Sequence, residues 1–300
     1  MRAAAVRVPC STSNLGAGFD CVGLALQRWL EVRYFPDDEP LRIEHAGTLR
    51  GVSTDPERNL LARTLRIGLA ARGVRRATGR LVATSDIPVS RGLGSSGAAT
   101  VAGLTLAAAA AGQALDRTAE LERALTLEGH PDNAGPALFG GLIAVARGHG
   151  DNLPHALALP LSDALSFAFA APDVEVTTAR ARNALPGTVP HAVATRGLGR
   201  LAALLRGLET ADPALLTLGF EDELHVPYRL PLIPRAQQAI DAARSAGAIA
   251  VTISGSGSGL IAVAAPDTTA AVAHAMGTAF GNGVAFAIDA DRTGVVGLND

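Results

Sequence analysis

A glycine- and serine-rich stretch, SRGLGSSGAAT at residues 90–100, has the composition of a phosphate-binding loop. It stands directly before a long alanine-rich segment, which favours a helix. A helix N-terminus presents unpaired N–H groups and the positive end of the helix dipole. Glycines let the backbone approach an anion closely, and serine hydroxyls add donors or a metal ligand. These residues predict an anion site, although an ordinary connection before a helix has the same composition.

The chain contains no lysine, and all 26 of its basic residues are arginine. A Walker-type phosphate loop, a protein-kinase site and a Schiff-base enzyme each need a lysine, so all three are excluded. Positive charge beside a bound phosphate must therefore come from oriented backbone amides, from a metal ion or from an arginine such as Arg91.

Two further segments combine glycine with polar residues. PCSTSNLGAGFDCVGLAL at 9–26 places Asn14 and Asp20 in a loop between two predicted strands. TISGSGSGLIAV at 252–263 alternates glycine and serine between two apolar strands. Asn and Asp are also common turn formers, and the second segment is compatible either with a plain hairpin or with a tight contact against another loop. Neither segment alone distinguishes a binding site from a turn.

Length and charge place the chain among globular proteins. Its 300 residues are 48% hydrophobic and carry a formal net charge of −2, which argues against a nucleic-acid or acidic-membrane binder. Cys10 and Cys21 are too few for a disulfide framework and indicate a reduced, cytoplasmic protein. We expect no signal peptide, because Arg7 and Pro9 interrupt any apolar run near the N-terminus. We also expect no membrane span, because segment 97–115 is only weakly hydrophobic.

The apolar patterns predict strands and helices mixed in both halves. Strands are expected at 3–9, 21–35, 41–47, 79–88, 142–146, 164–172 and 283–288, with two more inside 248–266. Helices are expected at 59–73, 97–115, 116–129, 191–208, 234–247 and 268–280. A composition shift near 148–155 predicts domains at 1–152 and 153–300. Because the elements do not repeat as strict βαβ units, the predicted class is α+β.

Together, the three glycine-rich segments resemble the GHMP kinases, named for galactokinase, homoserine, mevalonate and phosphomevalonate kinases. PCSTSNLGAGFD, PVSRGLGSSGA and SGSGSG match three motifs of that family in the family's order. The resemblance implies an N-terminal domain similar to ribosomal protein S5 domain 2, a ferredoxin-like C-terminal domain, and an ATP site that uses backbone amides and Mg²⁺ instead of a lysine. The implied ATP contacts are Asn59 (to adenine), Pro88, Val89, Ser90, Arg91, Gly92, Leu93, Gly94, Ser95, Ser96, Gly97, Ala98, Gly255, Ser256 and Gly257.

The segment EGHPDNAGPALFGG at 128–141 resembles the homoserine kinase branch of the family, as do TTARARNALP at 177–186 and VPYRLPLIP at 226–234. This implies phosphorylation of the small molecule L-homoserine by ATP, a step of threonine biosynthesis. The implied metal ligands are Ser96 and Glu122. The implied substrate contacts are Arg182, Arg229 and Thr178 for the carboxylate, Asp20 and Asp132 for the ammonium, and Asn14, Asn133 and His130 for the hydroxyl.

Phosphoryl transfer mainly requires positioning and charge neutralisation. We expect the γ-phosphoryl over residues 92–96 and in-line attack by the substrate hydroxyl. The resemblance implies no dedicated base, and Asp20 stays an alternative base. Ser258 and Gly259 depart from the third motif and predict a more flexible loop there. Gly97 replaces the family's usual alanine at a cost of about 1 kcal/mol within a helix.

Two other functions stay open. One is a GHMP kinase for another small alcohol, such as shikimate or an isoprenoid precursor. The other is a catalytically silent member that senses a metabolite, against which the retained Ser96 and Glu122 argue. We expect no nucleic-acid or membrane partner, and a homodimer is the default expectation for the assembly.

Overall fold

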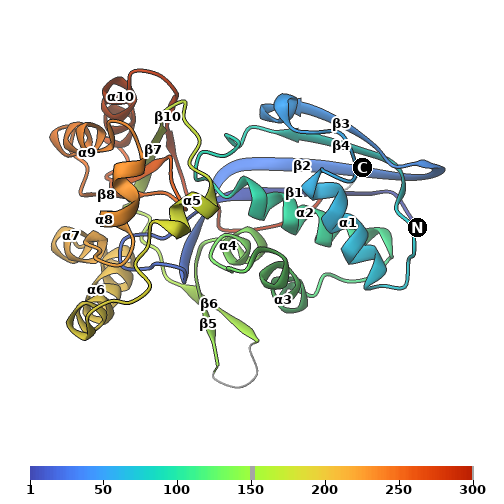
Figure 1. Cartoon of the computed structure of the whole chain (residues 1–300), viewed down its shortest axis with the longest axis horizontal. Helices are drawn as coiled ribbons and strands as arrows, with labels where there is room; N and C mark the ends of the chain where they lie inside the picture. The colour runs from blue at the N-terminus through green and yellow to red at the C-terminus, as the bar shows by residue number, and fades with distance from the viewer. Residues whose placement is uncertain (149–152, 299–300) are drawn as a thin grey trace.

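A seven-stranded sheet forms the first half of the protein (Figure 1). The structure, a computed structural model, describes residues 1–148 and 153–298. In this described part the sheet has the order β11-β1-β2-β4-β3, and β5 and β6 extend it from β2. Its β3–β4 pair is parallel and its other pairs are antiparallel. The strands are β1 (Ala4–Ser13), β2 (Val22–Pro40), β3 (Arg42–Gly47), β4 (Thr78–Ser85), β5 (Leu142–Arg147), β6 (Pro154–Leu159) and β11 (Val296–Gly297).

The central helix of this half is the predicted alanine-rich segment, which is buried along most of its length. Small residues bring it close to its neighbour. A Cβ added at Gly103 would lie 2.1 Å from Thr64 Oγ1, and one at Gly68 would lie 2.6 Å from Ala107 Cβ. The sequence therefore selects a tightly packed helix pair rather than a membrane span. The helices here are α1 (Leu60–Ala70), α2 (Ser95–Ala110), α3 (Arg117–Glu128) and α4 (Ala134–Phe139), with the short 3-10 turn η1 (Thr48–Gly51).

A second, antiparallel sheet of order β10-β7-β9-β8 forms the other half. Its central strand β7 (Ser166–Ala171) is buried on both faces. Phe167 and Phe169 join the core of the first half, whereas Ala168 and Ala170 join a second core that includes α9 and α10 residues. The remaining elements are β8 (Ala250–Ile253), β9 (Leu260–Ala264), β10 (Val284–Ile288), α5 (Thr178–Asn183), α6 (His191–Thr210), α7 (Pro213–Phe220), α8 (Val226–Arg229), η2 (Leu230–Leu232), α9 (Ala236–Ser245) and α10 (Thr269–Phe280).

The chain passes from the first sheet to the second later than the composition shift near 148–155. The predicted boundary at 152 falls outside the described residues, but β5 and β6 on either side of it pair as one hairpin of the first sheet. The chain changes sheet between Leu159 and Ser166, and β11 later returns to pair with β1. We therefore propose a boundary at 160–165 instead of 152, with the C-terminal strand belonging to the first half.

Most predicted elements are confirmed, including the helix expected at 116–129, which Asp116 caps: its side chain accepts hydrogen bonds from the N–H groups of Thr118 and Ala119. The α+β class is confirmed. The sequence prediction missed α4 and β6, where proline and glycine interrupt the patterns, and gave no range for α5, α7, α8, β11 or the two short 3-10 turns. In the described part of the chain, no helix is both long and apolar enough to cross a bilayer.

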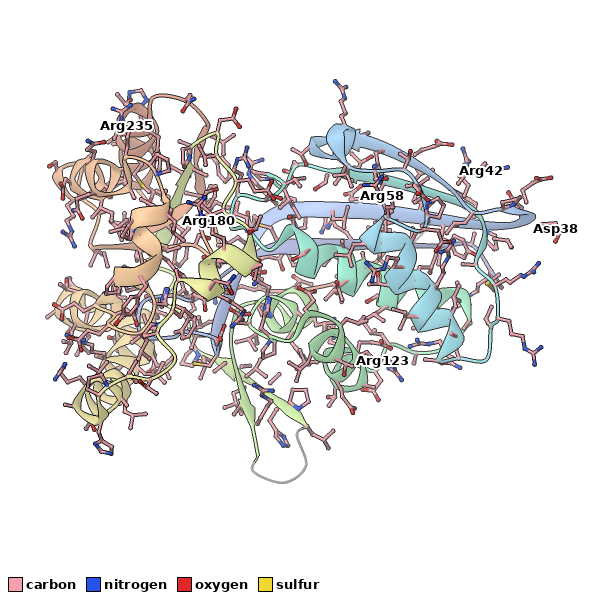
Figure 2. The ribbon with its side chains drawn as sticks, viewed as in Figure 1. Asp38, Arg42, Arg58, Arg123, Arg180 and Arg235 are labelled. Carbon is pink, nitrogen blue, oxygen red and sulfur yellow. The ribbon has the colours of Figure 1, made fainter. Side chains whose placement is uncertain are left out.

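Charged side chains project from both halves of the molecule (Figure 2). The labelled residues Asp38 and Arg42 lie at the end of the first sheet where β2 passes to β3, Arg58 precedes α1, and Arg235 lies at the start of α9. Because the chain has no lysine, its basic surface consists of guanidinium groups.

Candidate active site

The three glycine-rich segments meet where β1, the start of α2 and the β8–β9 turn touch. Ser254 Oγ donates to Gly92 O at 2.7 Å, and Gly255 N donates to Ser13 O at 2.9 Å. Gly92 has a φ of +89°, and a Cβ there would lie 2.3 Å from Ser254 O, so glycine is required. The 252–263 segment is therefore the tight contact against a second loop, not a plain hairpin.

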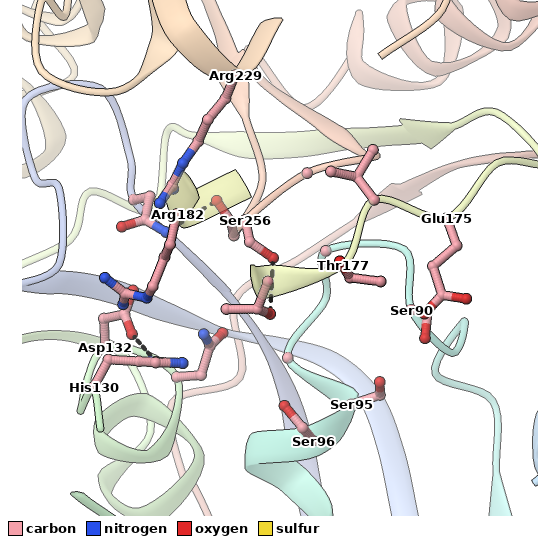
Figure 3. A pocket seen from close by; sticks show the side chains of 18 of the residues that line it. Ser90, Ser95, Ser96, His130, Asp132, Glu175, Thr177, Arg182, Arg229 and Ser256 are labelled. Carbon is pink, nitrogen blue, oxygen red and sulfur yellow. Dashed lines mark hydrogen bonds and ion pairs between the residues drawn. The ribbon is translucent and has the colours of Figure 1, made fainter. Parts of the chain in front are cut away.

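The start of α2 is arranged as an anion site. Its N-cap residue Gly94 is left-handed (φ 60°), and no side chain caps this end in the described structure. The first N–H groups of the helix therefore remain available to an anion. Ser95 and Ser96 add hydroxyls at the same place, and both line a cavity of about 220 Å³ (Figure 3).

All eight predicted substrate residues line this cavity, although they come from four distant parts of the chain. The predicted ATP contacts divide into two groups. Those that line the cavity are Ser90, Gly92, Gly94, Ser95, Ser96, Gly255, Ser256 and Gly257. Those outside the cavity lining are Asn59, Pro88, Val89, Arg91, Leu93, Gly97 and Ala98. Three lining residues that the sequence analysis missed are Glu175, Val176 and Thr177, for which adjacency to Thr178 was the only available signal.

Asn59 has a structural role that conflicts with the predicted adenine contact. Its side chain is 2% exposed, accepts from Ala62 N at 3.1 Å to cap α1, and donates to Ser53 O at 2.7 Å. It also lies 3.3 Å from His45 Nε2. These contacts engage both ends of the amide, so an adenine would have to compete with one of them, and the adenine contact stays a prediction.

Three other residues predicted to contact ATP have partners within the protein. Leu93 and Ala98 are buried in the core, and Arg91 pairs with Asp173 at 2.6 Å. A Cβ at Gly97 would lie only 3.0 Å from Asn133 Cβ, so this glycine allows α2 to pack closely against the cavity wall. The helix-propensity cost predicted for Gly97 is therefore offset, at least in part, by avoided crowding.

Gly259 is also explained by packing. A Cβ there would lie 2.4 Å from Arg91 O and 2.5 Å from Phe169 Cε2, and Ser258 is fully buried. This departure from the family motif fits the β8–β9 turn tightly against the first loop. The greater flexibility predicted for the turn stays a prediction.

At the substrate end, Arg182 and Asp20 bind each other. Arg182 Nη1 and Nη2 donate to the two carboxylate oxygens of Asp20, both at 3.0 Å. The hydrogen bond to Asp20 raises the pKa of Arg182. The groups predicted to bind the carboxylate and the ammonium of an amino acid thus form one complementary pair, each side chain about one-third exposed (39% and 35%).

Arg229 is a buried cation without a carboxylate partner among the described residues. It is 2% exposed, its Nε donates to Ala181 O at 3.3 Å, and its Nη1 has no hydrogen-bond partner there. Burial lowers the pKa of its guanidinium. Figure 3 shows Arg182 and Arg229 entering the cavity from one side, with Ser95 and Ser96 on another. An anion placed between the two arginines would satisfy Arg229.

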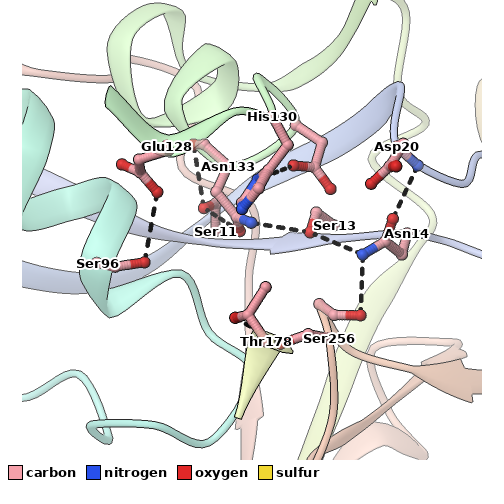
Figure 4. A network of polar contacts seen from close by, with 12 residues as sticks. Ser11, Ser13, Asn14, Asp20, Ser96, Glu128, His130, Asn133, Thr178 and Ser256 are labelled. Atoms are coloured by element: carbon pink, nitrogen blue, oxygen red, sulfur yellow. Dashed lines mark hydrogen bonds and ion pairs between the residues drawn. The ribbon is translucent and has the colours of Figure 1, made fainter. Parts of the chain in front are cut away.

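A polar network holds the remaining side chains in place (Figure 4). Asn133 Nδ2 donates to Ser13 Oγ at 3.0 Å, and Asn14 Nδ2 donates to Gly255 O at 2.9 Å. His130 Nδ1 lies 2.8 Å from Asp132 Oδ1, and this hydrogen bond is the main reason that the pKa of His130 is raised. Because its Nδ1 faces Asp132, His130 presents Nε2 to other partners.

The carboxylate beside Ser96 is Glu128, not Glu122. Glu128 Oε2 lies 3.5 Å from Ser96 Oγ, whereas Glu122 is exposed on α3 and does not line the cavity. Six residues of helix separate the two by about 120° around the axis, so they face different directions. Glu128 Oε1 is buried with no partner in the described structure, and burial raises the pKa of this carboxyl.

A hydroxyl and a buried carboxylate with an unpartnered oxygen are hard oxygen donors of the kind Mg²⁺ prefers. Ser96 and Glu128 therefore fit a magnesium ion. Within the described residues there is no cluster of three or more His, Cys, Asp or Glu side chains that could hold a metal. Two protein ligands suit Mg²⁺, which is usually held by one or two protein groups together with phosphate and water.

Comparison with known proteins identifies the family. The family models for the N-terminal and C-terminal domains of GHMP kinases match residues 59–141 and 201–282. The chain belongs to the GHMP kinase family. A homoserine kinase of Thermus thermophilus is 39% identical over 270 residues, which cover 90% of this chain and 89% of that protein. A homoserine kinase of Gloeobacter violaceus is 37% identical over 293 residues, covering 96% and 97%.

Solved structures of GHMP kinases share the fold. A homoserine kinase from Cytophaga hutchinsonii has a TM-score of 0.85 and 26% identity, and the match covers 99% of this chain and 98% of that one. A mevalonate kinase of L. major has a TM-score of 0.73 at 15% identity, covering 95% of each chain, which shows the fold alone. The family and the two-domain GHMP kinase fold implied by the sequence motifs are confirmed.

Proposed function

We propose that the protein is an ATP-dependent homoserine kinase, which transfers the γ-phosphoryl group of ATP to the hydroxyl of L-homoserine. The observation that carries this proposal is one cavity with two unlike ends. One end is the uncapped, glycine-flanked start of α2. The other holds the Asp20–Arg182 pair and Arg229, whose Nη1 has no hydrogen-bond partner among the described residues. The homoserine kinases among the relatives of this chain support the same substrate.

The substrate end fits an α-amino acid. Two guanidinium groups can bind a carboxylate, and guanidinium matches it in bidentate geometry. Asp20, once Arg182 turns to the substrate, is available to the ammonium, and Asp132 lies nearby in the cavity lining. An acceptor without an anionic group would leave the Nη1 of Arg229 without a hydrogen-bond partner among the described residues. The chemistry of the lining therefore favours a small zwitterion.

The phosphate end positions ATP through the backbone. The N–H groups of the first turn of α2 and the hydroxyls of Ser95 and Ser96 face the phosphates, and they need no lysine. Ser96 and Glu128 would hold Mg²⁺, which neutralises charge on the transferred phosphoryl group when bound. His130, fixed by Asp132, orients the attacking hydroxyl. No dedicated base is required for a loose transition state, so we assign none.

The wider assignments follow from the same proposal. We propose ATP and Mg²⁺ as the cosubstrate and cofactor, threonine biosynthesis as the pathway and the cytoplasm as the compartment. The homodimer stays a prediction.

The first experiment measures ADP release from Mg²⁺-ATP with L-homoserine, mevalonate, shikimate or no acceptor. Release that depends on homoserine supports the proposal. Release with another acceptor alone would keep the kinase and refute the substrate assignment. No ADP release in any of the four conditions, from a folded protein that binds ATP, would favour the metabolite-sensing alternative.

A further inference from the structure

Two segments far apart in the sequence carry the opposite halves of the substrate end. The loop after β1 carries Asn14 and Asp20, and α8 carries Arg229. A small substrate that touches both halves requires a fixed distance between them. The contact that joins this loop to α8 therefore bears on which substrates bind.

His225 makes that contact from inside the protein. It is fully buried just before α8, and its Nε2 lies 3.2 Å from Gly16 O. A carbonyl oxygen only accepts, so Nε2 carries a proton and donates to it. The imidazole also stacks on the Phe19 ring, with centroids 4.9 Å apart and planes inclined by 19°. His225 thus binds the loop both through its backbone and through a side chain.

Phe19 in turn contacts Arg229. The guanidinium carbon of Arg229 lies 4.9 Å from the Phe19 ring centroid, in the range of a cation–π contact. Apart from this ring, the described structure gives the guanidinium one hydrogen bond, from Nε to Ala181 O. The His225–Phe19 stack is therefore a main support for the orientation of Arg229.

Further hydrogen bonds and close contacts hold both sides of this contact, the start of α8 and the loop after β1. Asp222 Oδ2 accepts hydrogen bonds from His225 N and Val226 N, both at 2.7 Å, and fixes the start of α8. On the loop side, Ala17 N donates to Gly219 O at 3.0 Å. A Cβ at Gly16 would lie 2.5 Å from Gly219 O, so the loop lies directly against the end of α7.

We propose that His225 and Phe19 are positioning residues that set the place of Arg229 relative to Asp20, and thereby make the site selective for a substrate with a carboxylate. This inference rests on the proposed homoserine kinase function. It assigns no chemical step to either residue. Their effect is expected in substrate binding through Arg229, rather than in ATP binding.

The test compares two acceptors, L-homoserine and L-homoserinamide, in which a neutral amide replaces the carboxylate. The measured quantity is the ratio of kcat/KM for homoserine to kcat/KM for homoserinamide. His225→Leu and Phe19→Leu are expected to lower this ratio at least about fivefold, the effect of losing one buried polar or aromatic support. KM for ATP is expected to hold. A general loss of structure would lower both kcat/KM values together and leave the ratio unchanged.

Two further variants sharpen the test. His225→Gln retains an N–H donor and is expected to keep a higher ratio than His225→Leu. Phe286→Leu is the matched control, because Phe286 also contacts another ring and an arginine, Arg28 at 3.7 Å, but does not line the cavity. It is expected to leave the ratio unchanged.

The inference is overturned if the ratio in Phe19→Leu equals that of the wild type, or if His225→Gln is no better than His225→Leu. Should His225→Leu fail to fold, Phe19→Leu still decides, since Phe19 is only half-buried. A wild-type protein that does not phosphorylate homoserine would refute the proposed function itself, which is a different result from an active enzyme with unchanged ratios.

Discussion

Arg229→Leu is expected to weaken homoserine binding without lowering the stability of the folded protein. Arg229 is 2% exposed, and its Nη1 has no hydrogen-bond partner among the described residues. Its charge has therefore lost water without gaining a carboxylate partner in the protein. Such a group stabilises a bound anion strongly and contributes little to folding.

The magnitude follows from that burial. Truncating one partner of a buried, hydrogen-bonded charge pair costs about 2–5 kcal/mol. Because about 1.4 kcal/mol corresponds to a tenfold change, KM for homoserine should rise by about thirtyfold to several thousandfold. KM for ATP should hold, since the α2 start lies at the other end of the cavity. Replacing a buried unpaired charge by an apolar side chain is neutral or stabilising, so Tm should hold or rise by a few degrees.

The assay combines ADP-release kinetics over a wide range of homoserine with thermal unfolding of the unliganded protein. Arg244→Leu, the same change on the exposed face of α9, is the control. An unchanged KM would remove Arg229 from the site. A fall in Tm of several degrees would show that the guanidinium stabilises the fold, contrary to the reasoning from its missing partner.

Three further predictions test other parts of the structure. Glu128→Gln is expected to raise the Mg²⁺ concentration for half-maximal activity at least about tenfold, whereas Glu122→Gln leaves it unchanged; the reverse pattern would restore Glu122 as the ligand. Gly259→Ala is expected to lower the free energy of unfolding by about 1–3 kcal/mol in urea titrations, because its Cβ has no room. Its control is Gly187→Ala, whose Cβ meets no described atom within 4 Å, and equal stability of the two would show that the turn relaxes. Burial is the main reason that the pKa of His225 lies below its ordinary value; Arg229 lowers it as well, whereas Asp222 and Asp20, which also face it, raise it. The folded state then binds fewer protons than the unfolded state, so the stability present above pH 6.5 declines as pH falls below it. His225→Phe should reduce the dependence of the free energy of unfolding on pH, measured by urea titrations at successive pH values. An unchanged dependence would show that groups other than His225 cause it.

Particular residues show where sequence reasoning about the site succeeded. Gly92, Gly94, Ser95 and Ser96 act through backbone shape and hydroxyls next to a helix start, which are properties of a short continuous segment. The sequence motif therefore placed them correctly at the cavity. The eight substrate residues were also placed there, because their motifs belong to a family whose fold this chain shares.

Other assignments depend on contacts that lie outside any motif. Asn59 stands before an amphipathic segment, and whether its amide caps the helix or faces a ligand depends on Ser53 and His45. Glu122 and Glu128 lie on one helix, and only the packing of α3 beside α2 decides which faces Ser96. The boundary at 152 was predicted from composition, whereas the pairing of β5 with β6 on either side of it depends on the tertiary structure.

By itself, the sequence determined the residue chemistry of this protein: a phosphate loop without lysine, acidic and arginine side chains for a zwitterion, and the periodic patterns of most strands and helices. Those properties depend on residue type and on neighbours along the chain. Only the tertiary structure decided that Asp20 binds Arg182, that Arg229 has no carboxylate partner among the described residues, and that His225 joins α8 to the β1 loop. These contacts join residues about 160 to 210 positions apart, and their burial and distances arise from the packing of the two sheets and their helices.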